Sequence, residues 1–269
     1  MHRDRDLVSE RHSYPMPTAT STVTKPTFVA QVPLKAGLKP SLVADSSTYS
    51  MDPTMAQTST SATLRSLYTR AARAFVLRDI TTTSSLLQSA FFLLKPPSGS
   101  GDSLADDRRK WDILRITFES TVYTSPPSPP THESLPDSLR SILVEAPQAL
   151  ATSIYNRSLS LFTPSNGAAQ KTTLNAAYLP SQVLTTLVYC SLKLDAPDVG
   201  RVIIEDWIAR REPRYTLDSR EGEGDVYEKI LELYCLHILP KLEQWDYAKE
   251  FLQYESELSP LRREVCLCH

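Results

Sequence analysis

Apolar residues recur at steps of three and four along most of the chain, which is the spacing of one face of an α-helix. In residues 63–79, for example, Leu67, Ala71, Ala74 and Phe75 take these positions, with good helix formers between them. β-branched residues never alternate with polar ones over the length of a strand, so no sheet is expected. The pattern predicts an all-α fold of about eight or nine helices of ordinary length. They are expected within residues 63–79, 81–94, 103–123, 137–146, 147–162, 179–194, 197–211, 224–242 and 245–258.

Two stretches lack this periodicity. Residues 1–60 contain 8 Ser, 9 Thr and 6 Pro and cannot bury enough apolar surface to offset the entropy of ordering, which predicts a disordered tail. Residues 125–136, "SPPSPPTHESLP", form a proline-rich loop by composition. The helical domain is therefore expected over residues 61–258, followed by a short C-terminal segment at 259–269.

A weak internal repeat marks three of the predicted helix-to-helix turns. Each turn has an acid, a small residue five positions later and a bulky apolar residue three further on: Asp79, Ser84 and Leu87; Asp195, Gly200 and Ile203; Glu243, Ala248 and Phe251. A small residue lets two antiparallel helices approach closely. We therefore expect antiparallel helical hairpins stacked as a short tetratricopeptide-like solenoid, although the roughly 34-residue period of that family is missing. The alternative is that any helical hairpin has a small residue near its crossing; both interpretations predict the same fold.

A proline interrupts the last apolar stretch, "ILELYCLHILPKLEQWDYAKEFLQYE", residues 230–255. Proline lacks a backbone donor and clashes with the preceding turn, so a helix is expected to end within a residue of Pro240. The repeat places the turn at Glu243 and the close crossing at Ala248. This stretch is therefore predicted to be the last hairpin rather than one broken helix.

Composition excludes several classes of function. A net charge of -2 and a pI near 6.2 argue against a nucleic-acid partner, because such surfaces are usually strongly basic. With 7 Gly against 20 Pro and no glycine-rich phosphate loop, nucleotide cofactors are not expected. Two of the four cysteines lie inside apolar helical patterns, which favours a reducing compartment. No run reaches the roughly 18 to 20 uninterrupted apolar residues of a membrane span.

Candidate ligands and acids are better explained as structural groups. His237 lies mid-helix and is expected to be a structural histidine, while the ending "CLCH", residues 266–269, lacks the second ligand pair of a zinc site. Glu205 and Asp206 are neighbours on a helix and point about 100° apart, so they cannot face each other across a substrate and should be solvated. No nucleophile lies in a triad motif. No catalytic, cofactor-binding or metal-binding residue is predicted, and the chain is not expected to be an enzyme.

Two basic clusters are expected at solvated helix ends. They are Arg108–Lys110 and the set Arg210, Arg211 and Arg214, each adjoined by acids. A rim for an acidic partner helix is the alternative for both.

The residues resemble those of one known family. The stretches "YLPSQVLTTLVYCSLKLDAPDVGRVIIEDWIARR" and "YEKILELYCLHILPKLEQWDYAKEFL" resemble fungal peroxin-26, in the helix opening on Leu-Pro, the tryptophan-containing helix at Trp207 and the segment 236–252. The earlier "AARAFVLRDITTTSSLLQSAF" is similar to the first hairpin of that family. The resemblance covers roughly residues 64–258 and contains no short invariant motif.

The resemblance implies a non-catalytic adaptor at the cytosolic face of the peroxisomal membrane. Such an adaptor recruits the AAA ATPase peroxin-6, with peroxin-1, which extracts import receptors for recycling during matrix protein import. In the family the first hairpin contributes to holding the ATPase, and residues 70–94 match it here. Helical geometry leaves Arg70, Arg73 and Arg78 as exposed candidates for partner binding, with Phe75, Leu77, Leu86 and Leu87 facing the core. The rival hypothesis is a general helical-repeat scaffold with an unrelated partner.

The sequence departs from the family at its C-terminus. The resemblance implies a membrane anchor there, whereas the sequence ends in "LRREVCLCH". We expect that residues from Val265 onward come from a retained intron or from a form without an anchor.

Overall fold

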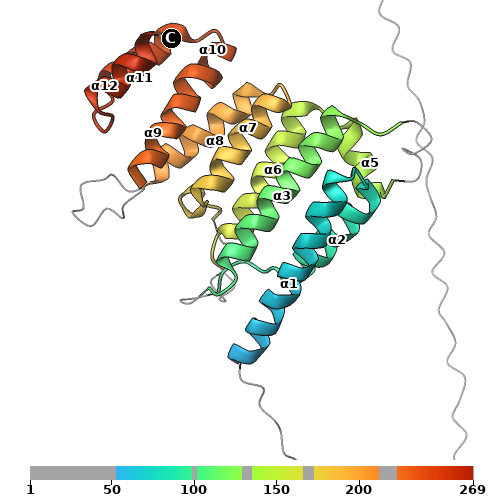
Figure 1. The fold of residues 1–269 in the computed structure, drawn as a ribbon. Helices are drawn as coiled ribbons and strands as arrows, with labels where there is room; N and C mark the ends of the chain where they lie inside the picture. Colours follow the sequence, from blue (N-terminus) through green and yellow to red (C-terminus); the bar gives the residue numbers. More distant parts are fainter. Residues whose placement is uncertain (1–52, 99–101, 129–134, 166–172, 212–222, 269) are drawn as a thin grey trace, which may run out of the picture. The chain divides into compact units, whose positions relative to one another are not determined.

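The computed structural model describes residues 53–98, 102–128, 135–165, 173–211 and 223–268, all within one compact unit, Ser50–His269. These residues are helical and contain no strand, which confirms the all-α prediction (Figure 1). The helices are α1 (Pro53–Val76), α2 (Ile80–Leu93), α3 (Ala105–Thr124), α5 (Asp137–Val144), α6 (Pro147–Phe162), α7 (Ser181–Lys193), α8 (Pro197–Arg210), α9 (Glu223–Leu233), α10 (Leu239–Lys241), α11 (Trp245–Tyr254) and α12 (Pro260–Cys268). A short 3₁₀ turn, Ala176–Tyr178, precedes α7, and a π-helical turn, Tyr234–Ile238, joins α9 to α10.

Helix α1 begins earlier than predicted. Residues 53–60, assigned to the disordered tail from composition, are helical, while residues 1–52 lie outside the described part of the chain. Pro53 suits the first turn of a helix, where its missing N–H has no partner to lose. Ser61 then donates to the Asp107 carboxylate of α3 at 2.7 Å. This contact, which composition cannot reveal, ties the early part of α1 to the core.

The C-terminal segment also contains a helix that was not predicted. In α12, Arg262 pairs with Glu228 at 3.4 Å and with Glu232 at 3.2 Å, both on α9. Because the two acids are four residues apart, they lie on one face of α9 and can share one guanidinium. The helical part of the chain therefore extends beyond the predicted boundary at residue 258.

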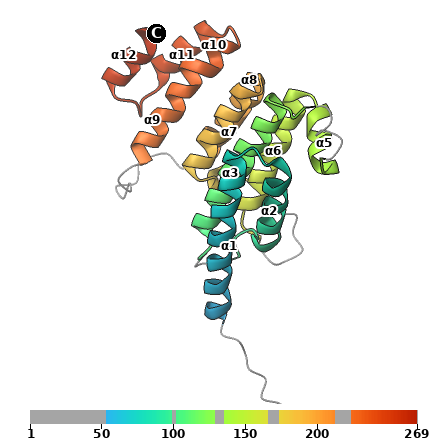
Figure 2. The ribbon, with the colours of Figure 1, turned by 45° about the vertical axis from the view of Figure 1, so that its right-hand side comes forward.

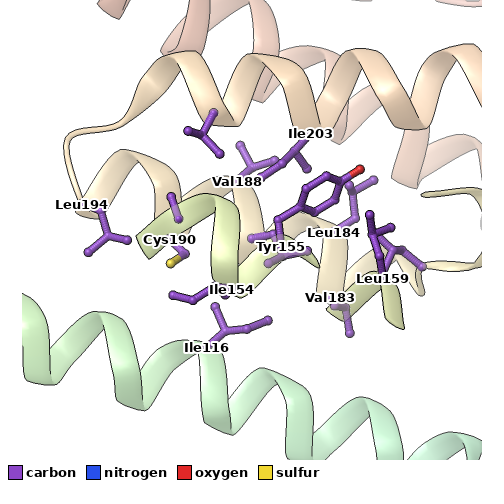
Figure 3. Packing of buried hydrophobic residues seen from close by; sticks show 14 of the residues in the cluster. Ile116, Ile154, Tyr155, Leu159, Val183, Leu184, Val188, Cys190, Leu194 and Ile203 are labelled. Carbon is purple, nitrogen blue, oxygen red and sulfur yellow. The ribbon is translucent and has the colours of Figure 1, made fainter. Parts of the chain in front are cut away.

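The core lies where α3, α6, α7 and α8 meet. Ile116 of α3, Ile154 of α6, Leu184 and Val188 of α7, and Ile203 of α8 are all fully or almost fully buried and point toward one another (Figure 3). Helix α1 is joined to α3 by aromatic contacts, since Tyr68 meets Trp111 and Phe75 meets Phe118 edge to face. Figure 2 shows α1 and α2 beside α3 and α6 from a second side. The first hairpin is therefore anchored on α3.

Three helical hairpins share one turn geometry. Two residues after each first helix comes a residue with positive φ: Arg78 (58°), Asp195 (55°) and Glu243 (58°). In every case this residue donates its N–H to the carbonyl three residues back, and the next residue donates to the carbonyl five back, at 2.8–2.9 Å. These are the two bonds of the Schellman motif. The second helix then begins two residues after the left-handed one, at Ile80, Pro197 and Trp245.

The shared turn corrects the predicted repeat in its first copy. Asp79 is not the residue with positive φ but the N-cap of α2, where its carboxylate accepts from the backbone N–H of the third helical residue. The equivalent small and bulky positions are therefore Thr83 and Leu86, one residue earlier than the predicted Ser84 and Leu87. The other two copies have the predicted register. Stacking of the hairpins as a solenoid stays a prediction.

A small residue lies at a close crossing in the second copy of the repeat, and the small residue of the third copy is buried. Ala248 is buried, and Gly200 lies where a Cβ atom would come 2.3 Å from Ser191 Oγ on α7 and 2.6 Å from Ile238 Cδ1 on the π-helical turn. Such distances are too short for a real Cβ contact. Three elements therefore meet at Gly200, and only a residue without a side chain fits there unchanged.

The helix containing Pro240 ends where predicted. It stops at Lys241, and the left-handed residue of the turn follows two positions later at Glu243. Directly before the proline the helix widens into the π-helical turn, in which Leu239 N–H donates to Tyr234 O. In a regular α-helix the ring of Pro240 would press on the carbonyl of Leu236. The π turn changes this register, because Leu239 N–H donates to a carbonyl five residues back instead of four.

Candidate functional site

The first hairpin has an unusually cationic outer face. Helix α1 contains Arg65, Arg70 and Arg73 but no acid, and Arg78 follows in the turn. Arg70, Arg73 and Arg78, the three candidates from the sequence, are all exposed. None of the three has an ion pair within the described ranges, whereas many other arginines do. Their charges are therefore available to a partner.

Two large apolar side chains lie among these cations. Val76 and Leu77, at the end of α1, are 79% and 69% exposed. The prediction that Leu77 faces the core is wrong, because it is the helix C-cap directly before the left-handed Arg78, where the helical period no longer applies. We call the set Arg70, Arg73, Val76, Leu77 and Arg78 the first-hairpin surface.

A groove of about 650 Å³ adjoins this surface. Val76 and Arg78 belong to both, and the opposite wall comes from Val122 of α3 and from Pro126 and Pro127. Asp79 lines the groove and is already engaged as the N-cap of α2, where hydrogen bonds from Thr82 lower the pKa of its carboxyl. The sequence did not indicate the groove, because it needs α3 and the proline-rich loop beside α1.

The combination suits an acidic, amphipathic partner segment. Burying a Val or Leu side chain contributes about 1.5–3 kcal/mol, whereas an exposed ion pair contributes about 0.2–1 kcal/mol. Val76 and Leu77 would therefore supply most of the affinity. The arginines would orient the partner and accelerate its association.

Glu205 and Asp206 are partly solvated, as expected, but each also accepts a hydrogen bond from a tyrosine of another element. Tyr234 donates to Glu205 at 2.6 Å, and Tyr155 donates to Asp206 at 2.7 Å. The pKa of each tyrosine is raised, first by burial and second by the hydrogen bond that its hydroxyl donates to Glu205 or Asp206. As predicted, the two acids point to different neighbours. They join α8 to the π-helical turn and to α6.

The other two basic clusters are also partly structural. Arg108 was predicted to be solvated but is buried, donating to Lys95 O and pairing with Asp102. Arg211 pairs with Glu257 and lies 3.7 Å from the centre of the Tyr227 ring. Lys95 and Glu257 lie 13 and 46 residues from their arginines, beyond the reach of a local charge pattern. Asp102 is only six residues from Arg108, but it lies before the start of α3 and its pairing was not predicted. Arg210 remains exposed and pairs with Asp206, and Arg214 lies outside the described residues.

The remaining candidates add no chemistry. His237 is exposed, and the described part of the chain contains no group of three or more His, Cys, Asp or Glu side chains placed to hold a metal. The side chains of "CLCH" lie outside the described ones. Among the helices described, none has the length and apolar character needed to cross a bilayer.

Comparison of the chain with models of protein families, with curated proteins and with solved structures gave no match.

Proposed function

We propose that this chain is a non-catalytic adaptor that recruits an AAA-ATPase complex of the peroxin-1 and peroxin-6 kind. It would act at the cytosolic face of the peroxisomal membrane, in the recycling of import receptors. The proposal rests on the resemblance of residues 64–258 to fungal peroxin-26. Its support in the structure is the first-hairpin surface, which lies in the segment that the resemblance assigns to the ATPase.

Geometry and charge favour protein binding at this surface. Arginines without ion pairs flank two exposed apolar side chains beside a groove, and central apolar contacts with a charged rim are typical of protein interfaces. Hairpin α1–α2 is also anchored on α3 by edge-to-face aromatic pairs. A partner would thus meet a preformed surface and lose less ordering entropy on binding.

The test is a pull-down of purified peroxin-6, with and without peroxin-1, by the full chain in the presence of ATP. A double variant, Arg70→Glu with Arg73→Glu, reverses two charges on the surface. Its matched control is Lys229→Glu with Lys249→Glu, which reverses two exposed lysines on α9 and α11. We expect the control to retain peroxin-6 and the arginine variant to lose it. Equal retention by both variants, or none by the unmodified chain, would refute the proposal.

The second candidate is a helical-repeat scaffold with an unrelated partner, favoured by the three equivalent hairpin turns. Affinity capture followed by mass spectrometry separates the two hypotheses. A partner other than peroxin-6 that depends on Arg70 and Arg73 would support the scaffold.

A further inference from the structure

A second groove lies at the other end of α2 from the first-hairpin surface. Its volume is about 850 Å³, and its walls are the C-terminal end of α2, with Phe91, and one face of α6, with Ser153 and Asn156. Arg115 of α3 and Arg157 of α6 also line it. A smaller hollow of about 390 Å³ adjoins it and shares both arginines. The groove is open to solvent along much of its length, which suits an extended ligand better than an enclosed one.

Arg115 forms part of the groove wall and is mostly buried. Its side chain is 12% exposed, pairs with Asp112 and lies 4.4 Å from the centre of the Phe91 ring. Its Nε–H is buried and has no hydrogen-bond partner among the described residues. A buried donor without an acceptor is costly, but this nitrogen lies beneath the groove surface, so a ligand would contact the terminal part of the Arg115 side chain rather than Nε.

The groove presents cations while their counter-charges lie beneath. Asp112 is fully buried and Glu119 is 8% exposed, whereas Arg157, which binds Glu119 through both terminal nitrogens, is 38% exposed. No Asp or Glu is among the described residues that line the larger groove. A ligand there therefore meets the positive ends of two ion pairs.

The walls add polar and apolar contacts on opposite sides. On α6, Ser153 and Asn156 are exposed, and the Asn156 amide offers donors as well as an acceptor. On the α2 side, Phe91, Leu94 and Pro96 form an apolar wall. A carboxylate above the arginines would therefore have room for an apolar neighbour against this wall.

We infer that this groove binds a segment of a partner protein in which acidic residues flank one bulky apolar residue. The carboxylates lie over Arg115 and Arg157, and the apolar side chain packs against Phe91. This inference is independent of the proposed function, because it concerns different side chains at the opposite end of α2.

The test is a selection from a random-peptide phage library on the full chain. Bound peptides are then measured by fluorescence anisotropy against Asn156→Glu, which adds a carboxylate to the groove, and Gln182→Glu, a control on an exposed amide of α7. Ser153→Glu is a second variant on the groove wall, and circular dichroism confirms that each variant is folded. A further titration uses inorganic phosphate alone.

The expected peptides are acidic with an apolar centre, and added salt weakens their binding. Asn156→Glu and Ser153→Glu should raise their Kd by about tenfold or more, since one opposed charge commonly costs this much, while Gln182→Glu leaves it unchanged. The inference is overturned if no peptide is enriched, if enriched peptides are not acidic, or if they bind the groove variants as well as the unmodified chain. Binding of phosphate without peptide binding would also overturn it, and would mark the groove as a site for a free anion.

Discussion

The close contact at Gly200 makes a specific prediction for Gly200→Ala. In an open helix this change stabilises by about 0.8–1 kcal/mol, because alanine has the higher helix propensity. Here the new methyl group would lie 2.3 Å from Ser191 Oγ and 2.6 Å from Ile238 Cδ1. Ser191 donates to Val188 O at 2.8 Å, so rotating its hydroxyl away loses a buried hydrogen bond.

The opposing terms can be compared. Forcing a methyl group into a packed contact costs about 1–3 kcal/mol, and the lost hydrogen bond about 0.5–1.5 kcal/mol. Together they exceed the gain in propensity, so we expect Gly200→Ala to be destabilising by about 0.5–3.5 kcal/mol. Urea unfolding followed by circular dichroism measures this directly. Val202→Ala, on the exposed face of α8, is the control and should be much milder.

Double variants identify the clash as the cause. Ile238→Val removes Cδ1, and Ser191→Ala removes Oγ, so each takes away one atom that the new methyl group meets. Combined with Gly200→Ala, each should cost less than the sum of the single changes, a coupling that independent sites do not show. The reasoning is refuted if Gly200→Ala is as stable as the unmodified chain. It is also refuted if the destabilisation of each double variant equals the sum of its two single changes, because α7, α8 and the π-helical turn would then not meet closely at Gly200.

Three further predictions concern other buried positions. Ala248→Leu should destabilise the last hairpin by about 1–3 kcal/mol in urea unfolding, because Ala248 is buried at its crossing; an unchanged midpoint would contradict this. Burial raises the pKa of the Asp112 carboxyl above 3.8, so its contribution to stability is lost as pH rises through the folded pKa. The unfolding free energy of Asp112→Asn relative to the unmodified chain should therefore increase as the pH rises above the ordinary pKa of an Asp side chain, about 4, and a flat difference would refute it. Burial raises the pKa of the Cys190 thiol to about 12, so alkylation mapped by mass spectrometry should reach it only in urea; rapid labelling of the folded chain would contradict this.

Local periodicity was enough to predict most helices and the end of the helix at Pro240. It failed where the deciding partner lies far along the chain. Arg211 was expected at a solvated helix end, but it pairs with Glu257, 46 residues further along the chain. Residues 53–60 have the composition of a tail, yet α1 continues through them and is tied to α3.

The candidate site was predictable only in its charged part. Helical geometry left Arg70 and Arg73 exposed, as the structure does. Leu77 was assigned to the core because the helical period was continued through it. In the structure α1 ends at Val76, directly before Leu77. The nearby Asp79 marks the start of α2, not the end of α1. The two grooves need three or more elements to be placed together, which no local pattern provides.

Arg78 has a backbone conformation that favours glycine and a side chain that belongs to the first-hairpin surface. A side chain with Cβ costs about 1–2 kcal/mol in this conformation, whereas glycine adopts it freely. Arg78→Gly should therefore leave the fold as stable as before or slightly more stable, even after the added entropy of the unfolded chain. If the first-hairpin surface binds a partner, the same change weakens that binding. A variant that gains stability and loses its partner cannot be explained by a folding defect, which makes position 78 the most direct place to separate the two.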